Sequence, residues 1–231
     1  PRDGSCLYYS AGRRVKRISL ESFERQTLFD MPAAVGTPFG IDTLSYDMTR
    51  CLTVTQPRAG VWAVAVLDLE QQTGHIVYER TGAPVGHLQY VRNRGRRFLV
   101  QVNDGYRADA DGNCLRLIGP RGATLHVLHD DGSGHARLPV GFTLTERVQG
   151  HQCWVGPHNT VITTLHRRSR RSAPWVQDRI VTVDVDSGER RTVGEGQGFT
   201  HIHTTADGAY WVADCNRTAD IFVGAVATGR Y

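Results

Sequence analysis

The sequence lacks several features that would place it in a common class of protein. No apolar run approaches the roughly 18 residues that a membrane-spanning helix needs, and the opening residues PRDGSCLYYS contain no apolar signal-peptide segment. We therefore expect neither a membrane-spanning helix nor an intact signal peptide. The motifs G-x-S-x-G, G-x-x-x-x-G-K-[ST] and G-x-G-x-x-G are also missing, which argues against the common hydrolase, NTPase and dinucleotide-binding classes.

Cysteine is scarce, and its spacing shows no metal-binding pattern. The five cysteines are an odd number, widely spaced, with no C-x-x-C pair, so we expect free, mostly buried thiols and no thiolate metal site. Free thiols are typical of a reducing compartment, which predicts a cytoplasmic protein. The sequence does not exclude secretion, and only in a secreted protein would the glycosylation sequon Asn216-Arg217-Thr218 have meaning.

Positive charge is in only small excess over negative charge. The net charge of +4 and the pI near 9.0 favour an anionic partner only mildly. The densest basic segment, HRRSRRSAPW at 166–175, contains Arg167, Arg168, Arg170 and Arg171 with Trp175 as its one aromatic residue. We interpret it as a solvated loop tip, because a nucleic-acid surface interleaves aromatic and basic residues. The sequence thus predicts no nucleic-acid or membrane partner, and it leaves the oligomeric state open.

Helical periodicity is missing as well. No stretch keeps apolar residues at i, i+3, i+4 and i+7 for three turns, whereas short β-branched runs and 25 glycines are spread along the chain. The 231 residues, 40% of them hydrophobic, are enough for a sizeable core. We expect a single all-β domain over residues 1–231.

Short strands recur along the chain. They start at Val15, Val64, Leu115, Ile180 and Phe222, at intervals of 49, 51, 65 and 42 residues. Two series of hairpins repeat around them. The first consists of ISLESFERQTLF, LDLEQQTGHIVYE and VDVDSGERRTV; the second consists of TLSYDMTRCLTVTQ, QYVRNRGRRFLVQV, CWVGPHNTVITTL and HTTADGAYWVADC.

Together the two series place about four strands in each period. A period of about 40 to 50 residues with four strands predicts a β-propeller of four-stranded blades, of which about five are visible. Five partial repeats do not close a typical ring, and Pro1 is not an initiator methionine. We therefore expect the chain to be part of a larger propeller.

Histidines stand just before apolar strands in three of these repeats, at His87, at His151, and at His201 with His203. Radially stacked blades would bring them to one axis, where imidazoles can act as bases or bind divalent cations. Residues two apart in a strand share a face, so His201 and His203 could both reach one ion. The alternative is that these histidines hydrogen-bond neighbouring blades, and for His87 this structural role is favoured.

The segments GHLQY, GHQCW and THIHTTADGAYWVAD, with the opening LYYSAGRRVKRISLESFERQTLF, resemble the oligogalacturonate lyases. The resemblance extends from about Cys6 to Val223. It implies a seven-bladed propeller that cleaves uronate disaccharides by β-elimination with the help of a divalent metal, manganese in that family. It places His151 at the position of the Brønsted base, and His201, with His203 beside it, at the metal.

A second alignment with the same family is open. The family completes its metal site with a Q-x-x-H-x-H motif, and Gln197 with THIH resembles it. However, Gln197 lies four residues before His201, where the family has three. We prefer the first alignment, because 50 residues between His151 and His201 suit adjacent blades. In both alignments His201 is a candidate ligand.

The chain departs from the family at an arginine that holds the substrate carboxylate or assists proton transfer. The corresponding position is Asn113, while Arg116 lies three residues later and Arg107 six residues earlier. The resemblance therefore implies Arg116 as the substitute catalytic residue, and Asn113, Arg107 and His87 as substrate-binding candidates. The departure leaves open a different uronate or no catalysis at all.

Two functions remain open. The first is metal-assisted β-elimination of an acidic oligosaccharide: His151 takes the C5 proton, a cation neutralises the carboxylate, and Tyr90 or a water protonates the leaving group. The second is a non-catalytic propeller of the TolB or WD kind, whose histidines brace its blades. Propeller folds carry many functions, so the fold alone does not decide between them.

Overall fold

A computed structural model describes residues 4–109, 113–120, 122–141, 146–167, 178–196, 198–215 and 218–231. In these residues the regular structure is almost entirely β-strand, with one short 3-10 helix, η1 (Ala33–Val35). This confirms the all-β prediction. Within the same ranges no helix has the length and apolar character needed to cross a membrane.

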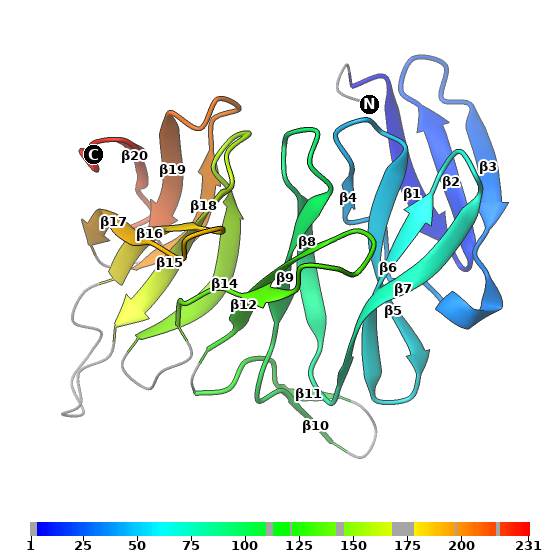
Figure 1. The fold of residues 1–231 in the computed structure, drawn as a ribbon, viewed down its shortest axis with the longest axis horizontal. Coiled ribbons are helices and arrows are strands. Elements are labelled where there is room, and N and C mark those ends of the chain that lie inside the picture. Colours follow the sequence, from blue (N-terminus) through cyan, green and yellow to red (C-terminus); the bar gives the residue numbers. More distant parts are fainter. Residues whose placement is uncertain are drawn as a thin grey trace.

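Five antiparallel sheets follow one another along the described chain, and each is one blade of a β-propeller (Figure 1). Blade 1 contains β1 (Cys6–Ala11), β2 (Arg14–Ser19) and β3 (Arg25–Asp30). Blade 2 contains β4 (Thr43–Leu44), β5 (Arg50–Arg58), β6 (Val61–Asp68) and β7 (Thr73–Thr81). Blade 3 contains β8 (Val85–Tyr90), β9 (Arg97–Val102), β12 (Thr124–His129) and β13 (Ala136–Arg137).

The last two blades complete the series. Blade 4 contains β14 (Glu146–Trp154), β15 (Thr160–Arg167), β16 (Asp178–Asp184) and β17 (Arg190–Gly196). Blade 5 contains β18 (Phe199–Thr204), β19 (Tyr210–Cys215) and β20 (Ile221–Ala225). The blades form an arc in chain order, with the two ends of the chain on opposite sides of the view (Figure 1).

The predicted hairpins are confirmed in both series. TLSYDMTRCLTVTQ, QYVRNRGRRFLVQV, CWVGPHNTVITTL and HTTADGAYWVADC form the first hairpins of blades 2 to 5, β4–β5, β8–β9, β14–β15 and β18–β19. The other three segments form β2–β3, β6–β7 and β16–β17. Turn residues between β-branched runs were sufficient to place them because hairpin pairing is local.

The repeat predicted from Leu115 differs from the structure. β11 (Cys114–Arg116) pairs with β10 (Arg107–Ala108) in a two-stranded sheet of its own, and the third strand of blade 3 is β12 instead. The hairpin is an insertion between β9 and β12, and it lies at the lower edge of the view (Figure 1). Its exposed Leu115 gave a strand-like pattern without belonging to the core.

The hydrophobic core lies between blades rather than at one centre. Leu52 and Val64 of blade 2 pack with Phe98 and Val100 of blade 3, and equivalent clusters join blades 1 and 2, blades 3 and 4, and blades 4 and 5. Burying each such side chain contributes roughly 1.5 to 3 kcal/mol. Every inner blade is therefore apolar on both faces.

The expectation of free, mostly buried thiols is confirmed. Cys51, Cys153 and Cys215 are buried, Cys6 is half-buried and Cys114 is exposed, and none forms a disulfide. Burial raises the pKa of Cys51 to about 12 and that of Cys153 to about 11. These two thiols therefore remain protonated at neutral pH and act as small apolar groups.

Some sequence predictions concern residues outside the described ranges. These are the segment with Arg168, Arg170, Arg171 and Trp175, the residue Gln197 of the second alignment, and Asn216 and Arg217 of the sequon. They stay predictions.

Candidate functional site

A cleft of about 1010 Å³ lies along the inner strands of blades 2 to 5. Its walls come from β4 and the turn after it, from β8, from β14 and from β18, each the first strand of its blade. Hydrogen bonds between blades hold these strands in place: the Trp154 indole N–H donates to the Gln89 carbonyl at 2.8 Å, and the Thr204 hydroxyl donates to the Trp154 carbonyl at 2.9 Å. His87, His151, His201 and His203 all line this cleft.

His87, His151 and His201 occupy equivalent irregularities in three consecutive blades. The pairing register shifts between Gly86 and Gln89 in blade 3, between Val148 and Gln152 in blade 4, and between Phe199 and Ile202 in blade 5. Each histidine lies inside one of these shifts, and His87 has a φ of 49°. A bulge re-aims a side chain away from the regular alternation of a strand. All three imidazoles consequently line the cleft.

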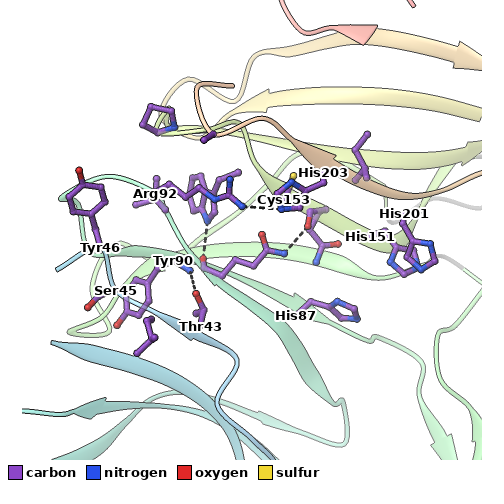
Figure 2. A pocket seen from close by; sticks show the side chains of 18 of the residues that line it. Thr43, Ser45, Tyr46, His87, Tyr90, Arg92, His151, Cys153, His201 and His203 are labelled. Atoms are coloured by element: carbon purple, nitrogen blue, oxygen red, sulfur yellow. Dashed lines mark hydrogen bonds between the residues drawn. The ribbon is translucent and has the colours of Figure 1, made fainter. Parts of the chain in front are cut away.

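The three imidazoles gather at one end of the cleft (Figure 2). The ring centroids of His151 and His201 are 4.2 Å apart, and those of His87 and His151 are 6.0 Å apart. Asp214 of β19 fixes His201, since its two carboxylate oxygens accept hydrogen bonds from the His201 backbone N–H at 2.7 Å and from Nδ1 at 2.8 Å. With Nδ1 directed at a carboxylate, the Nε2 atom of His201 is the nitrogen left for a ligand.

The surroundings of His151 and His87 favour the uncharged form of these two imidazoles. Burial, followed by the positive charges of His201 and His87, lowers the pKa of His151 to about 4, and burial lowers the pKa of His87. Burial acts in the opposite direction on Asp214, yet the hydrogen bonds from His201 hold the pKa of that carboxyl below its usual range. At neutral pH the cluster therefore combines a neutral His151 with an ionised Asp214.

His203 contacts different groups from His201. Its Nδ1 atom lies 2.8 Å from the Thr204 carbonyl, to which it donates, and its Nε2 atom lies 2.9 Å from a guanidinium nitrogen of Arg92. The guanidinium has only donors, so the ring is the Nδ1–H tautomer with both nitrogens hydrogen-bonded. The structure thus brings His201 to His151 and brings His203 to Arg92 (Figure 2).

A metal ion would need several of these groups around one point. Within the described residues no group of three or more His, Cys, Asp or Glu side chains is arranged to hold one, and the two nitrogens of His203 are already engaged. His201, oriented by Asp214, has the donor arrangement of a single ligand. The described residues therefore do not fit a complete metal site.

Three residues were expected to bind substrate or act in catalysis in place of the arginine of the lyases, and they lie outside the cleft wall. Arg107, Asn113 and Arg116 belong to the inserted β10–β11 hairpin or its turn, and none of them is part of the cleft wall. The Arg116 Nε atom donates to the Gly105 carbonyl at 2.8 Å, and Asn113 donates to the Asp109 carboxylate from its backbone and side chain. Their roles in binding or catalysis remain predictions that this placement does not support.

Tyr90, a predicted proton donor to the leaving group, lies in the cleft wall but is buried. Its hydroxyl donates to the Asp130 carboxylate at 3.2 Å. Burial and the nearby Asp130 charge raise the pKa of Tyr90 above its usual range. The Tyr90 hydroxyl therefore donates its proton to Asp130 and does not present it to a ligand.

Two residues that contact the cleft histidines, Asp214 and Arg92, were not identified from the sequence. Asp214 could have been found from the β18–β19 hairpin. Ile202 pairs with Ala213, so His201, one residue before Ile202, lies opposite Asp214, one residue after Ala213. Arg92 carries no such local signal. It follows β8 of blade 3 and reaches His203 of blade 5, 111 residues away, a contact that only the radial stacking creates.

Comparison with solved structures places the fold among propeller proteins. An oligogalacturonate lyase in complex with manganese is 15% identical, with a TM-score of 0.74, and the match covers 98% of this chain and 61% of that one. The oligogalacturonate lyase from Vibrio parahaemolyticus is 14% identical, with a TM-score of 0.71 and the same coverage. TolB from Acinetobacter baumannii is 11% identical, with a TM-score of 0.59, covering 99% of this chain and 51% of that one.

These matches show a shared fold. The chain is similar in fold to the oligogalacturonate lyases, and it spans about three fifths of the length of those structures. No protein-family model matches the sequence, and no curated protein matches it either. Because TolB shares the architecture as well, function has to be argued from the cleft itself.

Proposed function

We propose that the cleft binds an acidic, uronate-containing oligosaccharide and that His151 removes a proton from it in a β-elimination. The observation that carries this proposal is the gathering of His87, His151 and His201 in three matching bulges at one end of the cleft, with His201 fixed by Asp214. The likeness in fold to oligogalacturonate lyases supports the choice of substrate.

The reaction requires a base at C5, because the C5 proton of a uronate is only weakly acidic. An imidazole nitrogen of His151 accepts this proton. The electron pair of the C5–H bond forms a C4=C5 double bond, the C4–O bond breaks, and the glycosidic oxygen leaves with its electrons and takes a proton from water. General-base assistance of this kind contributes roughly 10²- to 10⁴-fold to the rate.

The surroundings of His151 suit it to act as a base only once substrate is bound. In the free cleft, burial and the neighbouring imidazoles lower the pKa of His151 to about 4, which keeps the ring unprotonated. A substrate carboxylate entering the cleft adds a negative charge, and a negative charge favours the protonated imidazolium. Binding thus increases the basicity of His151 at the moment when it must accept a proton.

The test is an elimination assay with a histidine substitution. The wild-type chain is incubated with oligomers of galacturonate, glucuronate or iduronate, and the unsaturated product is followed by its ultraviolet absorbance. We expect the His151→Ala variant to lose about 100-fold or more of the rate. His75→Ala is the matched control, because His75 is an exposed histidine on β7 outside the cleft wall and its loss should leave the rate unchanged.

Manganese is suggested only by the resemblance to the lyases, and proton removal by His151 does not require it. The assay is therefore run with added Mn²⁺ and with a chelator. If no unsaturated product forms from any of the three oligomers under either condition, the lyase proposal is wrong. Binding of the oligomers without cleavage would then favour a non-catalytic propeller scaffold.

A further inference from the structure

Arg92 stands out among the described residues of the cleft wall by its charge. In the described part of the chain the cleft wall contains no Asp, Glu or Lys, and Arg92 is its one permanently charged side chain. Other arginines lie close to carboxylates: Arg50 is 3.0 Å from Asp130, and Arg80 is 3.2 Å from Asp104. The cleft therefore holds a positive charge without a neighbouring counter-charge among its described wall residues.

The partner of Arg92 is a neutral acceptor. His203 donates its Nδ1–H to the Thr204 carbonyl at 2.8 Å, so its Nε2 atom carries a lone pair toward the Arg92 guanidinium at 2.9 Å. A guanidinium has five N–H donors, and this contact uses one of them. His203 thus orients the guanidinium without neutralising it, and the exposed side chain keeps donors for a ligand.

Arg92 and the histidine cluster line the same cleft. The residue reaches from blade 3 to blade 5 at the level of Cys153 on β14, so it crosses the inner face of blade 4 (Figure 2). His151 lies on the same strand of blade 4, toward the end where the imidazoles gather. A ligand in contact with His151 therefore occupies the cleft that Arg92 faces.

We propose that Arg92, oriented by His203, binds a carboxylate of the acidic sugar and makes the cleft selective for anionic over neutral oligosaccharides. A planar guanidinium matches a carboxylate with two parallel hydrogen bonds, which are stronger than neutral ones because both partners are charged. The inference rests on the proposed function for its ligand class. Arg92 is then the substrate-binding cation that the inserted β10–β11 hairpin does not supply to the cleft.

The test measures binding rather than turnover. Calorimetric titration of the full chain uses digalacturonate and its methyl ester, which has the same sugar rings without the negative charges. We expect Arg92→Gln to weaken digalacturonate binding by about 10- to 100-fold and to leave ester binding within about twofold, with Arg92→Lys between Arg92→Gln and wild type. Arg94→Gln is the matched control. Arg94 is an exposed arginine of the same turn outside the cleft wall, and its substitution removes the same net charge.

His203 is tested as a positioning residue by the same pair of ligands. His203→Ala removes the acceptor that orients the guanidinium, so we expect weaker binding of digalacturonate and unchanged binding of the ester. His203→Gln, which can still accept a hydrogen bond, should restore part of the loss. A role of His203 in stability alone would weaken the binding of both ligands equally.

The inference is overturned if Arg92→Gln binds digalacturonate as wild type does, if it loses acid and ester alike, or if Arg94→Gln reproduces its effect. Absence of digalacturonate binding to the wild-type chain overturns it as well. Failure of the proposed function gives a different result: binding that depends on Arg92 while no unsaturated product forms, with His151→Ala binding as tightly as wild type.

Discussion

Single residues outside the cleft are also held in defined charge states, and His126 of β12 is the clearest case. The Thr124 hydroxyl donates to Asp104 at 2.7 Å and lies 3.0 Å from the Nε2 atom of His126, so this nitrogen is the donor to the hydroxyl oxygen. The Nδ1 atom then accepts from His135 at 2.9 Å. Protonation of Nδ1 would break this chain.

His126 therefore predicts a pH dependence of stability. Burial, followed by the charge of His135, lowers its pKa from 6.5 to about 4. Between these values the unfolded chain binds more protons than the folded one, so the free energy of unfolding rises with pH across this interval. The contribution is fully present above pH 6.5 and is lost as the pH falls toward 4, by up to about 3 kcal/mol.

Urea unfolding at several pH values between 4.5 and 7.5 measures this slope. We expect His126→Gln to flatten the slope relative to wild type, because Gln has no titrating group. His75→Gln, at an exposed position, should keep the wild-type slope. Identical slopes for wild type and His126→Gln would contradict the assignment.

At the scale of elements, the turns between first and second strands of adjacent blades are in close contact. Gly156 lies in the β14–β15 turn with φ +52°, and a Cβ there would lie 2.5 Å from the Gly208 nitrogen in the β18–β19 turn. Gly208 has φ +75°, and a Cβ there would lie 3.0 Å from the Val155 carbonyl oxygen. These glycines allow blades 4 and 5 to approach at the rim of the cleft, which positions β14 and β18 next to each other.

Gly156→Ala should therefore separate the two turns. Strain at positive φ and overpacking each cost about 1 kcal/mol or more, which predicts a fall in melting temperature of roughly 4 to 8 °C. Gly40→Ala is the control, because a Cβ at Gly40 meets no atom within 4 Å and its φ is not positive. Calorimetry compares the two variants, and equal melting temperatures would show that the turn contact contributes nothing.

At the scale of the whole molecule, charged groups join blades as well as apolar ones. The buried carboxylate of Asp130, at the end of β12 in blade 3, lies 3.0 Å from Arg50 of blade 2 and 3.5 Å from Arg96, and it accepts from the Tyr90 hydroxyl at 3.2 Å. Asp130 is thus a partner shared by two blades. Its loss would leave the buried Tyr90 hydroxyl without its acceptor, whereas Arg50 would keep Asp68 and Arg96 would keep Asp47.

Asp130→Ala is expected to lower the free energy of unfolding by about 1 to 3 kcal/mol, because the buried Tyr90 hydroxyl loses its acceptor. The control is Asp30→Ala, which removes an exposed carboxylate 3.5 Å from Arg14 and should cost less than about 1 kcal/mol. Urea unfolding followed by tryptophan fluorescence measures both. A similar small effect in the two variants would mean that the Asp130 contacts do not stabilise the junction between blades.

The sequence predicted the parts of the site that depend on local pattern. The repeated turns before His87, His151 and His201 identified three residues that share the cleft, because each hairpin forms from neighbouring residues and each blade repeats the last. Strand alternation alone predicted that His201 and His203 could reach the same ion, but it did not predict their different surroundings. The register shift before Ile202 and the contact with Arg92 separate their environments.

By itself the sequence determined the all-β class, the hairpins and the histidine turns, since these depend on turn residues and strand alternation within a few dozen residues. Only the tertiary structure decided that blade 3 takes β12 rather than the segment from Leu115 as its third strand. It also decided that Arg92 rather than Arg116 faces the cleft, and that Asp214 orients His201. The reason is that contacts between blades join residues far apart in the chain, and no local pattern records which blade faces which.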